Sequence, residues 1–183
     1  YDIHSEGILI TGVKVIEKGK EQRDILRLIW NNVRLSEGVR IDCYAMIAAT
    51  KMAEQRLTEL IEKYGIDTVE HCISVMQDRT EQAVRAYIEK IPDGTYYGQS
   101  STDDDGYELD VPVTVRCEAT VKGDKLIVDF SKSDKQRRGF VNCSYPSTYS
   151  DAVASSILFL DPALAEYHNE GTMRAIEVIA PEG

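Results

Sequence analysis

The sequence lacks the long apolar runs and targeting segments that would attach it to a membrane or direct it out of the cell. None of its apolar runs approaches the roughly 20 residues that a membrane-spanning helix needs. Its first residues, YDIHSEG, contain neither the basic region nor the apolar core of a signal peptide, and they do not include an initiator Met. We therefore expect a cytoplasmic protein without membrane association, and an internal segment of a longer chain.

The usual spacings of metal ligands and paired cysteines are also missing. The cysteines form no CxxC pair, which excludes a zinc ribbon, and a disulfide framework is not expected in a domain of this size. The histidines show neither HxH nor HxxxH spacing, so each one is expected to be isolated. We expect reduced thiols and no metal ligand set in this segment. The residues concerned are Cys43, Cys72, Cys117, Cys143, His4, His71 and His168.

Three common catalytic and nucleotide-binding motifs are absent. There is no GxxxxGK[ST] for a P-loop, no GxGxxG for a dinucleotide-binding fold, and no GxSxG for a nucleophile elbow. The net charge of -10 argues against binding to a phosphate backbone, which requires clustered Lys and Arg. The run KSDKQRR is basic only locally, and we expect no nucleic-acid partner.

The first half of the chain carries helical patterns. Residues 1–20 favour an N-terminal strand, and residues 21–30 favour a short helix. After the connector NNVRLSEGVRIDCYA, apolar residues recur at helical spacing as far as Tyr64, and Gly65 is a typical helix end. The segment DTVE, with Asp67 as the cap, predicts a second long helix that ends before Pro92. Two long helices with so short a connection predict an antiparallel helical hairpin.

The second half changes to a period of two. Apolar residues alternate from Leu109 to Val121, the KGDK turn follows, and KLIVDF predicts the partner strand. TYSDAVASSILFL predicts one further helix, and residues 175–180 predict a last strand. The fold class is therefore α+β, a helical hairpin followed by a mostly antiparallel sheet with one further helix. We treat residues 1–183 as a single segment, with helices over 1–92 and a β-rich part over 93–183.

The stretch VDFSKSDKQRRGFVNCSYPS is the richest in candidate site residues, with Asp129, Ser131, Gln136 and Asn142. It is compatible with a solvated hairpin loop, a basic patch or one wall of an active site. Asn142 lies among apolar residues that we expect to be buried, and a buried amide must be hydrogen-bonded. From the residues alone, the favoured interpretation of Asn142 is an amide that bonds the backbone of its own turn.

Two further pairs of polar residues are weaker candidates. Asn169 and Arg174 in NEGTMRAIEV are compatible with a turn and a solvated arginine, and Arg34 and Asp42 with an exposed ion pair of little stability. The acidic loop STDDDG lacks the ligand spacing of a calcium-binding loop, which favours a solvated acidic turn.

As an ordered set, segments along the whole chain resemble the hydantoinase B/oxoprolinase family. Asp129, Ser131, Gln136, Gly139 and Asn142 match one family motif, and Lys132 replaces its usual Gly. Asn169, Gly171, Arg174 and the final Pro-Glu-Gly match another, where Ala175 replaces the usual Pro. Arg34 and Asp42 also match, whereas Met46 stands where Gln is common. The segments are SEGILI, VKVIEKGK, NNVR, EKYGID, IPDGTYYG, VDFSKSDKQRRGFVN and NEGTMRAIEVIAPEG.

The resemblance implies an ATP-dependent hydrolase that opens a cyclic amide such as a hydantoin or 5-oxoproline. A hydantoinase A-like subunit or domain would bind ATP and phosphorylate the small-molecule substrate, and this B-type subunit would complete the hydrolysis at a divalent metal. The metal ligands are expected upstream of Tyr1, so the segment alone would be inactive. Asp129, Ser131, Gln136, Asn142, Asn169, Arg174, Arg34 and Asp42 are the substrate-positioning or metal-supporting candidates.

Two alternatives remain open at this point. Relatives of the family include ketone carboxylases, so the chain is also compatible with a subunit of an ATP-dependent carboxylase. A non-catalytic module that docks the A-type partner is the other alternative, because this segment by itself shows no complete catalytic constellation.

Overall fold

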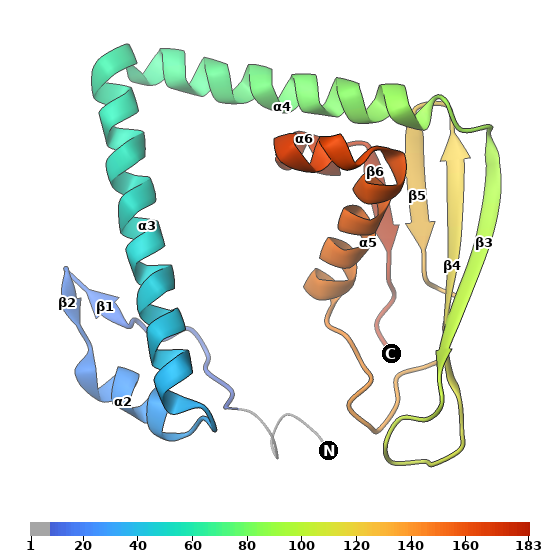
Figure 1. Cartoon of the computed structure of the whole chain (residues 1–183), viewed down its shortest axis with the longest axis horizontal. Helices are drawn as coiled ribbons and strands as arrows, with labels where there is room; N and C mark the ends of the chain where they lie inside the picture. Colours follow the sequence, from blue (N-terminus) through green and yellow to red (C-terminus); the bar gives the residue numbers. More distant parts are fainter. Residues whose placement is uncertain (1–7) are drawn as a thin grey trace. The chain divides into compact units, whose positions relative to one another are not determined.

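A computed structural model of the chain describes residues 8–183 (Figure 1). His4 and the Glu6-Gly7 pair of the first family motif lie outside the described residues. The chain divides into two compact units, residues 1–69 and residues 70–183. Within the described residues, no helix combines the length and the hydropathy needed to cross a membrane.

The first unit begins with a very short hairpin followed by helices. Lys18 and Gly19 form its turn, and both have positive φ, 49° and 75°, as a tight two-residue hairpin turn requires. The elements are β1 (Ile16–Glu17), β2 (Lys20–Glu21), α2 (Arg23–Asn31) and α3 (Ser36–Tyr64).

The N-terminal strand predicted over residues 1–20 is wrong in extent. Residues 8–15 have no regular secondary structure, and only Ile16–Glu17 is in a strand. Gly12 lies in the left-handed region with φ 58°, which interrupts the extended run, and the turn at Lys18 ends it. The short helix is confirmed, and α3 starts at Ser36, within the segment predicted to be a connector.

The break between the two long helices is confirmed at Gly65. Its φ of 83° cannot continue a helix, and its N–H still donates to the Ile61 carbonyl at 2.8 Å. The second helix, α4 (Ile66–Ile88), begins two residues earlier than the cap at Asp67 predicted, so Asp67 lies inside its first turn and is not the cap. The antiparallel arrangement of the two helices stays a prediction.

The second unit contains a four-stranded sheet in the order β3-β4-β5-β6. The first three strands are antiparallel, and β6 pairs in parallel with β5. The sheet is therefore mixed but mostly antiparallel, and the α+β class is confirmed. The strands are β3 (Gly94–Thr102), β4 (Val113–Lys122), β5 (Lys125–Asp129) and β6 (Ile176–Ile179).

Strand β4 starts later than the alternation predicted. The apolar pattern begins at Leu109, but the ladder to β3 begins only at Val113. Pro112 has no N–H to donate to a ladder, and Asp110 has a positive φ of 60°, so the chain cannot be extended and paired through these positions.

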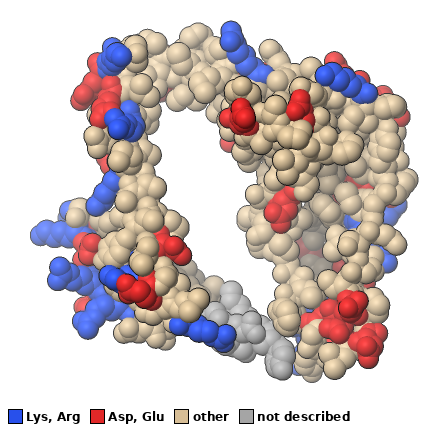
Figure 2. Space-filling view, in the orientation of Figure 1, with Lys and Arg blue, Asp and Glu red and all other residues tan. Residues whose placement is uncertain are grey.

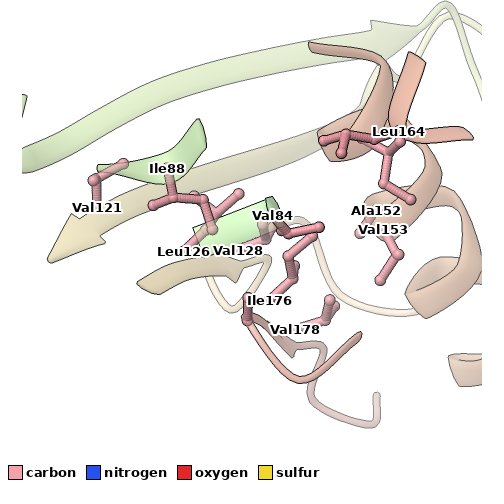
Figure 3. Close-up of a cluster of buried hydrophobic side chains, with 12 residues drawn as sticks. Val84, Ile88, Val121, Leu126, Val128, Ala152, Val153, Leu164, Ile176 and Val178 are labelled. Carbon is pink, nitrogen blue, oxygen red and sulfur yellow. The ribbon is translucent and has the colours of Figure 1, made fainter. Parts of the chain in front are cut away.

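The core of the second unit lies between the sheet and the helices that pack on it. Val84 and Ile88 of α4 are fully buried, and they meet Leu126 and Val128 of β5 (Figure 3). Val153, on the helix that follows the 130–144 segment, completes the contact. The helices after β5 are α5 (Tyr145–Leu160), the 3₁₀ helix η1 (Pro162–Tyr167) and α6 (Glu170–Met173).

Candidate functional site

A cavity of 1360 Å³ opens beside this core, between one face of β4 and β5 and the helix α5. Its sheet wall is apolar, with Val115, Cys117 and Ala119 from β4. Its remaining walls come from residues 130–143 and from the last four residues, 180–183. The cavity therefore combines an apolar surface with two loop segments that carry polar groups.

The two loop segments meet because β5 and β6 are parallel. Asp129 pairs in register with Ile179, so both strands end at the same edge of the sheet. The backbone then leaves β5 toward Ser131 and leaves β6 toward Pro181, and both residues line the cavity. The carboxyl ends of adjacent parallel strands are a common position for ligand sites in α/β proteins.

Asp129 forms the turn that leaves β5. Its Oδ1 atom accepts from the Ser131 N–H at 2.7 Å. The hydroxyl and the backbone N–H of Ser131 together hold the pKa of Asp129 below its usual range, and the charge of Lys132 acts in the same direction. Asp129 is thus a half-buried carboxylate that fixes the start of the loop.

The next residues attach the loop to β4. The Asp134 N–H donates to the Thr114 carbonyl and its Oδ2 atom accepts from the Thr114 N–H, both at 2.9 Å. Arg116 donates to Asp134 Oδ1 at 2.7 Å, and this bond is the main reason that the pKa of Asp134 is lowered. Backbone and side-chain contacts therefore extend the pairing of β4 beyond the end of β5.

Asn142 fixes the second half of the loop. Its Nδ2 atom donates to the carbonyls of Arg137 at 2.7 Å and Gly139 at 2.9 Å, and its Oδ1 atom accepts from the Arg137 N–H at 2.9 Å. The interpretation of Asn142 as a turn-stabilising amide is confirmed. The expectation that it lies among buried neighbours is wrong, because Asn142 is exposed and Phe140 is 65% exposed.

Gln136 differs from the other amides. It lines the cavity and is exposed, and its side chain makes no hydrogen bond to any residue in the range 8–183. The backbone on either side of it is fixed, at Asp134 by its N–H bond to the Thr114 carbonyl of β4 and at Arg137 by Asn142. Gln136 is therefore a cavity-lining residue on an anchored backbone, with an amide that no other residue in the range 8–183 engages.

Asn169 and Arg174 lie elsewhere in this unit, against α4. Asn169 caps α6 by accepting from the Gly171 N–H at 2.8 Å and donates to Thr80 Oγ1 at 2.8 Å. Arg174 donates to Asp78 at 2.9 Å and to Gln77 at 2.9 Å. Neither residue lines the cavity, so the structure does not bring these two candidates to Asp129, Ser131, Gln136 and Asn142.

Arg34 and Asp42 belong to the first unit. Arg34 lies in the turn between α2 and α3, Asp42 lies on α3, and both are exposed. The predicted ion pair between them does not form, since neither side chain makes a salt bridge within residues 8–183. The roles of all eight candidates in substrate positioning stay predictions.

The acidic loop contains a residue that the sequence pattern did not single out. Asp105 is only 2% exposed and accepts three backbone N–H bonds, so the prediction of a solvated acidic turn is wrong at this position. Other Asp and Glu side chains of the same loop gather at the surface between β3 and β4 (Figure 2). A small residue after the acidic run, Gly106, was the one available signal of a tight turn.

The nucleophile and metal chemistry of the described residues is limited. Burial and the neighbouring carboxylates Asp129 and Glu118 raise the pKa of the Cys117 thiol, which keeps it protonated and weakly nucleophilic. Among residues 8–183, no group of three His, Cys, Asp or Glu side chains could hold a metal ion. The residues present do not fit a metal centre, so no reaction step is assigned to one in this segment.

Comparisons with known sequences agree over the full chain. A sequence model of the family described as Hydantoinase B/oxoprolinase matches residues 1–183. The chain is 28% identical to the beta subunit of the caprolactamase of Pseudomonas jessenii over 183 residues, which is 100% of the chain and 31% of that protein. It is 32% identical over 192 residues to the B-type subunit of a putative D-/L-hydantoinase of Pseudomonas sp. (strain NS671), covering 100% of the chain and 32% of that protein.

The solved structures give the same result for the fold. The crystal structure of ATP-dependent caprolactamase from Pseudomonas jessenii matches with a TM-score of 0.82 and 26% identity, over 98% of this chain and 30% of that one. Nucleotide-free acetone carboxylase matches with a TM-score of 0.79 over 97% of this chain and 25% of that one, and at 22% identity this likeness shows the fold alone. The chain spans less than one third of the length of these relatives.

Proposed function

The chain belongs to the hydantoinase B/oxoprolinase family, and we propose that it is part of the B-type subunit of an ATP-dependent enzyme that hydrolyses a cyclic amide. The relatives named as a caprolactamase and a hydantoinase act on rings that contain an amide bond, which supports this class of substrate. The use of ATP supports a cytoplasmic location.

The proposed reaction divides the chemistry between two subunits. The relatives are named as subunits of larger enzymes, which implies a partner. A hydantoinase A-like subunit would transfer the γ-phosphoryl group of ATP to the carbonyl oxygen of the ring amide. Water then adds to the carbonyl carbon, and the C–N bond of the ring breaks to give an amine and an acyl phosphate. A second water molecule hydrolyses the acyl phosphate to a carboxylate and phosphate. A divalent metal for the water step remains a proposal for residues beyond this chain.

One observation carries the proposal for this segment. Two family motifs that are far apart in the sequence, at residues 129–142 and 181–183, contribute to one cavity because β5 and β6 end side by side. The apolar sheet wall suits the methylene groups of a lactam ring, and the Gln136 amide suits its polar C(=O)–NH edge. The role proposed for these residues is to bind and orient the ring.

The test uses the intact B-type subunit with its A-type partner. Caprolactam, hydantoin and 5-oxoproline are each incubated with ATP in ¹⁸O-labelled water, and the products are analysed by mass spectrometry. We expect a ring-opened product together with ADP and phosphate, and two ¹⁸O atoms in total in the new carboxylate and the released phosphate. The absence of ring opening with every one of these cyclic amides would contradict the proposal.

A carboxylase is the second candidate, because the fold is shared with acetone carboxylase. In that case a substrate enolate attacks an activated carboxyl group, and carbon from bicarbonate enters the product. The same preparation is therefore incubated with ¹³C-labelled bicarbonate and a ketone such as acetophenone. A labelled carboxylation product would replace the hydrolase proposal, which predicts that the ketone is left unchanged.

A further inference from the structure

Asp105 is a buried carboxylate that has no part in the proposed reaction. Its Oδ1 atom accepts from the N–H groups of Tyr107 at 2.8 Å and Glu108 at 2.6 Å, which closes a turn in its own loop. Its Oδ2 atom accepts from the N–H of Gly139 at 3.3 Å. Gly139 is 34 residues away and lies in the loop that lines the cavity. A single carboxylate thus connects the acidic loop to the cavity loop.

The contact at Gly139 allows only a residue without a side chain. A Cβ atom at this position would lie 1.7 Å from the Asp105 carbonyl oxygen and 3.0 Å from the Asp105 Cβ atom. Nearby, the Arg138 guanidinium lies over the Tyr107 ring at 4.3 Å, which packs the same two loops together a second time. The two loops are therefore in direct contact at residues 138 and 139.

The bond to Gly139 acts on the part of the loop that holds the candidate site. Asn142 donates to the Gly139 carbonyl, and Asp105 accepts from the Gly139 N–H, so both polar groups of this residue are fixed. Gln136 and Asn142, on either side, line the cavity. We propose that Asp105 is a positioning residue that holds residues 136–142 in place as a wall of the substrate cavity. This inference rests on the proposed function.

Asp105→Asn is the sharpest test, because it preserves size and shape. The amide oxygen can keep the two bonds to Tyr107 and Glu108, but Nδ2 then faces the Gly139 N–H, so donor meets donor. In the intact two-subunit enzyme we expect KM for the cyclic amide to rise about tenfold with kcat changed less than about twofold, because saturating substrate restores the wall. A lower kcat at unchanged KM, as partial unfolding would give, contradicts the proposal.

A second measurement does not depend on any substrate. Hydrogen exchange of the intact protein should show the Gly139 amide exchanging about tenfold faster in Asp105→Asn, with Tyr107 and Glu108 unchanged. Unchanged protection at Gly139 would overturn the inference. If no cyclic amide is turned over but Gly139 loses protection, the proposed function fails while the connection between the loops stands.

Two companion variants complete the experiment. Asp104→Asn is the matched control, since Asp104 accepts from the Gly106 N–H at 2.8 Å within the acidic loop and does not reach Gly139. We expect its KM to equal that of the unchanged enzyme. Gly139→Ala disrupts the same contact from the other side, so the double variant with Asp105→Asn should raise KM no further than the more severe single variant. If the two substitutions instead raised KM by the product of their separate factors, the two residues would act separately and the inference would be contradicted.

Discussion

At the scale of single residues, hydrogen bonding separates the candidate amides into two kinds. The Asn142 amide donates to two backbone carbonyls. The Asn169 amide donates to Thr80 Oγ1 and to the Tyr167 carbonyl, and its oxygen accepts from the Gly171 N–H as the cap of α6. Gln136 has no such partner within residues 8–183. An amide that is fully hydrogen-bonded inside the protein holds the backbone in place, whereas one that is not can contact a substrate.

For Asn142 we predict an effect on stability. Asn142→Ala removes three hydrogen bonds to Arg137 and Gly139, and water can replace part of them because the side chain is exposed. The free energy of unfolding should fall by about 1–2 kcal/mol, as measured by urea denaturation. Asn142→Asp directs a carboxylate oxygen at two carbonyl oxygens, so it should cost at least as much as Ala. An Asp variant as stable as the parent would contradict this assignment.

For Gln136 we predict an effect on activity instead. Gln136→Ala should change the free energy of unfolding by less than about 0.5 kcal/mol, because no described contact is lost. If its amide binds the ring, kcat/KM for the cyclic amide should fall about tenfold, the equivalent of one hydrogen bond. Gln99→Ala is the control, because Gln99 is an exposed glutamine on β3 that does not line the cavity. Equal kcat/KM for the two variants would exclude Gln136 from substrate binding.

The sequence could predict these site residues only in part. Polar residues in a motif-like order identified 129–142, but the choice between backbone support and ligand contact depends on where each side chain points. The burial of Asp105 was not visible, because it depends on Gly139 lying 34 residues further along the chain. A run of three Asp residues has the composition of a solvated loop.

At the scale of elements, α4 changes character along its length. Its buried residues are Thr80, Val84 and Ile88, all in its C-terminal half, and Ile73 nearer its start is 45% exposed. Within α4, the core of the second unit is therefore contacted through the last turns of the helix.

This difference predicts that the same substitution, Ile to Ala, lowers the free energy of unfolding by different amounts at two positions of α4. Ile88→Ala leaves a cavity among Leu126, Val128 and their neighbours, and it should lower the free energy of unfolding by about 2–5 kcal/mol. Ile73→Ala, the matched control, should change it by less than about 0.5 kcal/mol. Urea denaturation of both variants gives the comparison, and equal midpoints would mean that the assigned core is wrong.

The periodic elements were the predictable part of the fold. Period two over β4 and β5 and period 3.6 over α3 to α5 identified them, and Gly65 gave the helix break. The predicted bounds of the N-terminal strand are wrong, because local turns at Gly12 and Lys18 override the apolar composition of the segment. The parallel pairing of β6 with β5 could not be predicted, because it is decided by long-range packing and not by either strand alone.

At the scale of the whole molecule, many carboxylates are held in their charged form by folding. Hydrogen bonds from Arg side chains, from other polar side chains or from backbone N–H groups lower the pKa of seven carboxyl groups in the described part of the chain. They are Glu37, Glu59, Glu81, Asp105, Asp129, Asp134 and Asp161. The folded state therefore binds fewer protons than the unfolded state in acid.

The sign of the pH dependence follows from these lowered pKa values. Each group contributes stability that is fully present above its unfolded pKa, about 3.9 for Asp and 4.3 for Glu, and that is lost as pH falls through the folded pKa. The urea midpoint should stay level at mildly acidic to neutral pH and should fall steeply below about pH 4.

Asp134 allows this prediction to be tested at one group. Asp134→Asn keeps the shape of the side chain but loses the charge that Arg116 contacts at 2.7 Å. The variant should be less stable than the parent at pH 7, and the difference should shrink toward pH 2.5 as Asp134 becomes protonated in the parent. Asp103→Asn, at an exposed residue of the acidic loop, controls for the change in net charge. A stability difference that stays constant from pH 7 to pH 2.5 would contradict this prediction. It would mean that protonating Asp134 in the parent does not change its stability, so that the Asp134 charge is not what stabilises the loop.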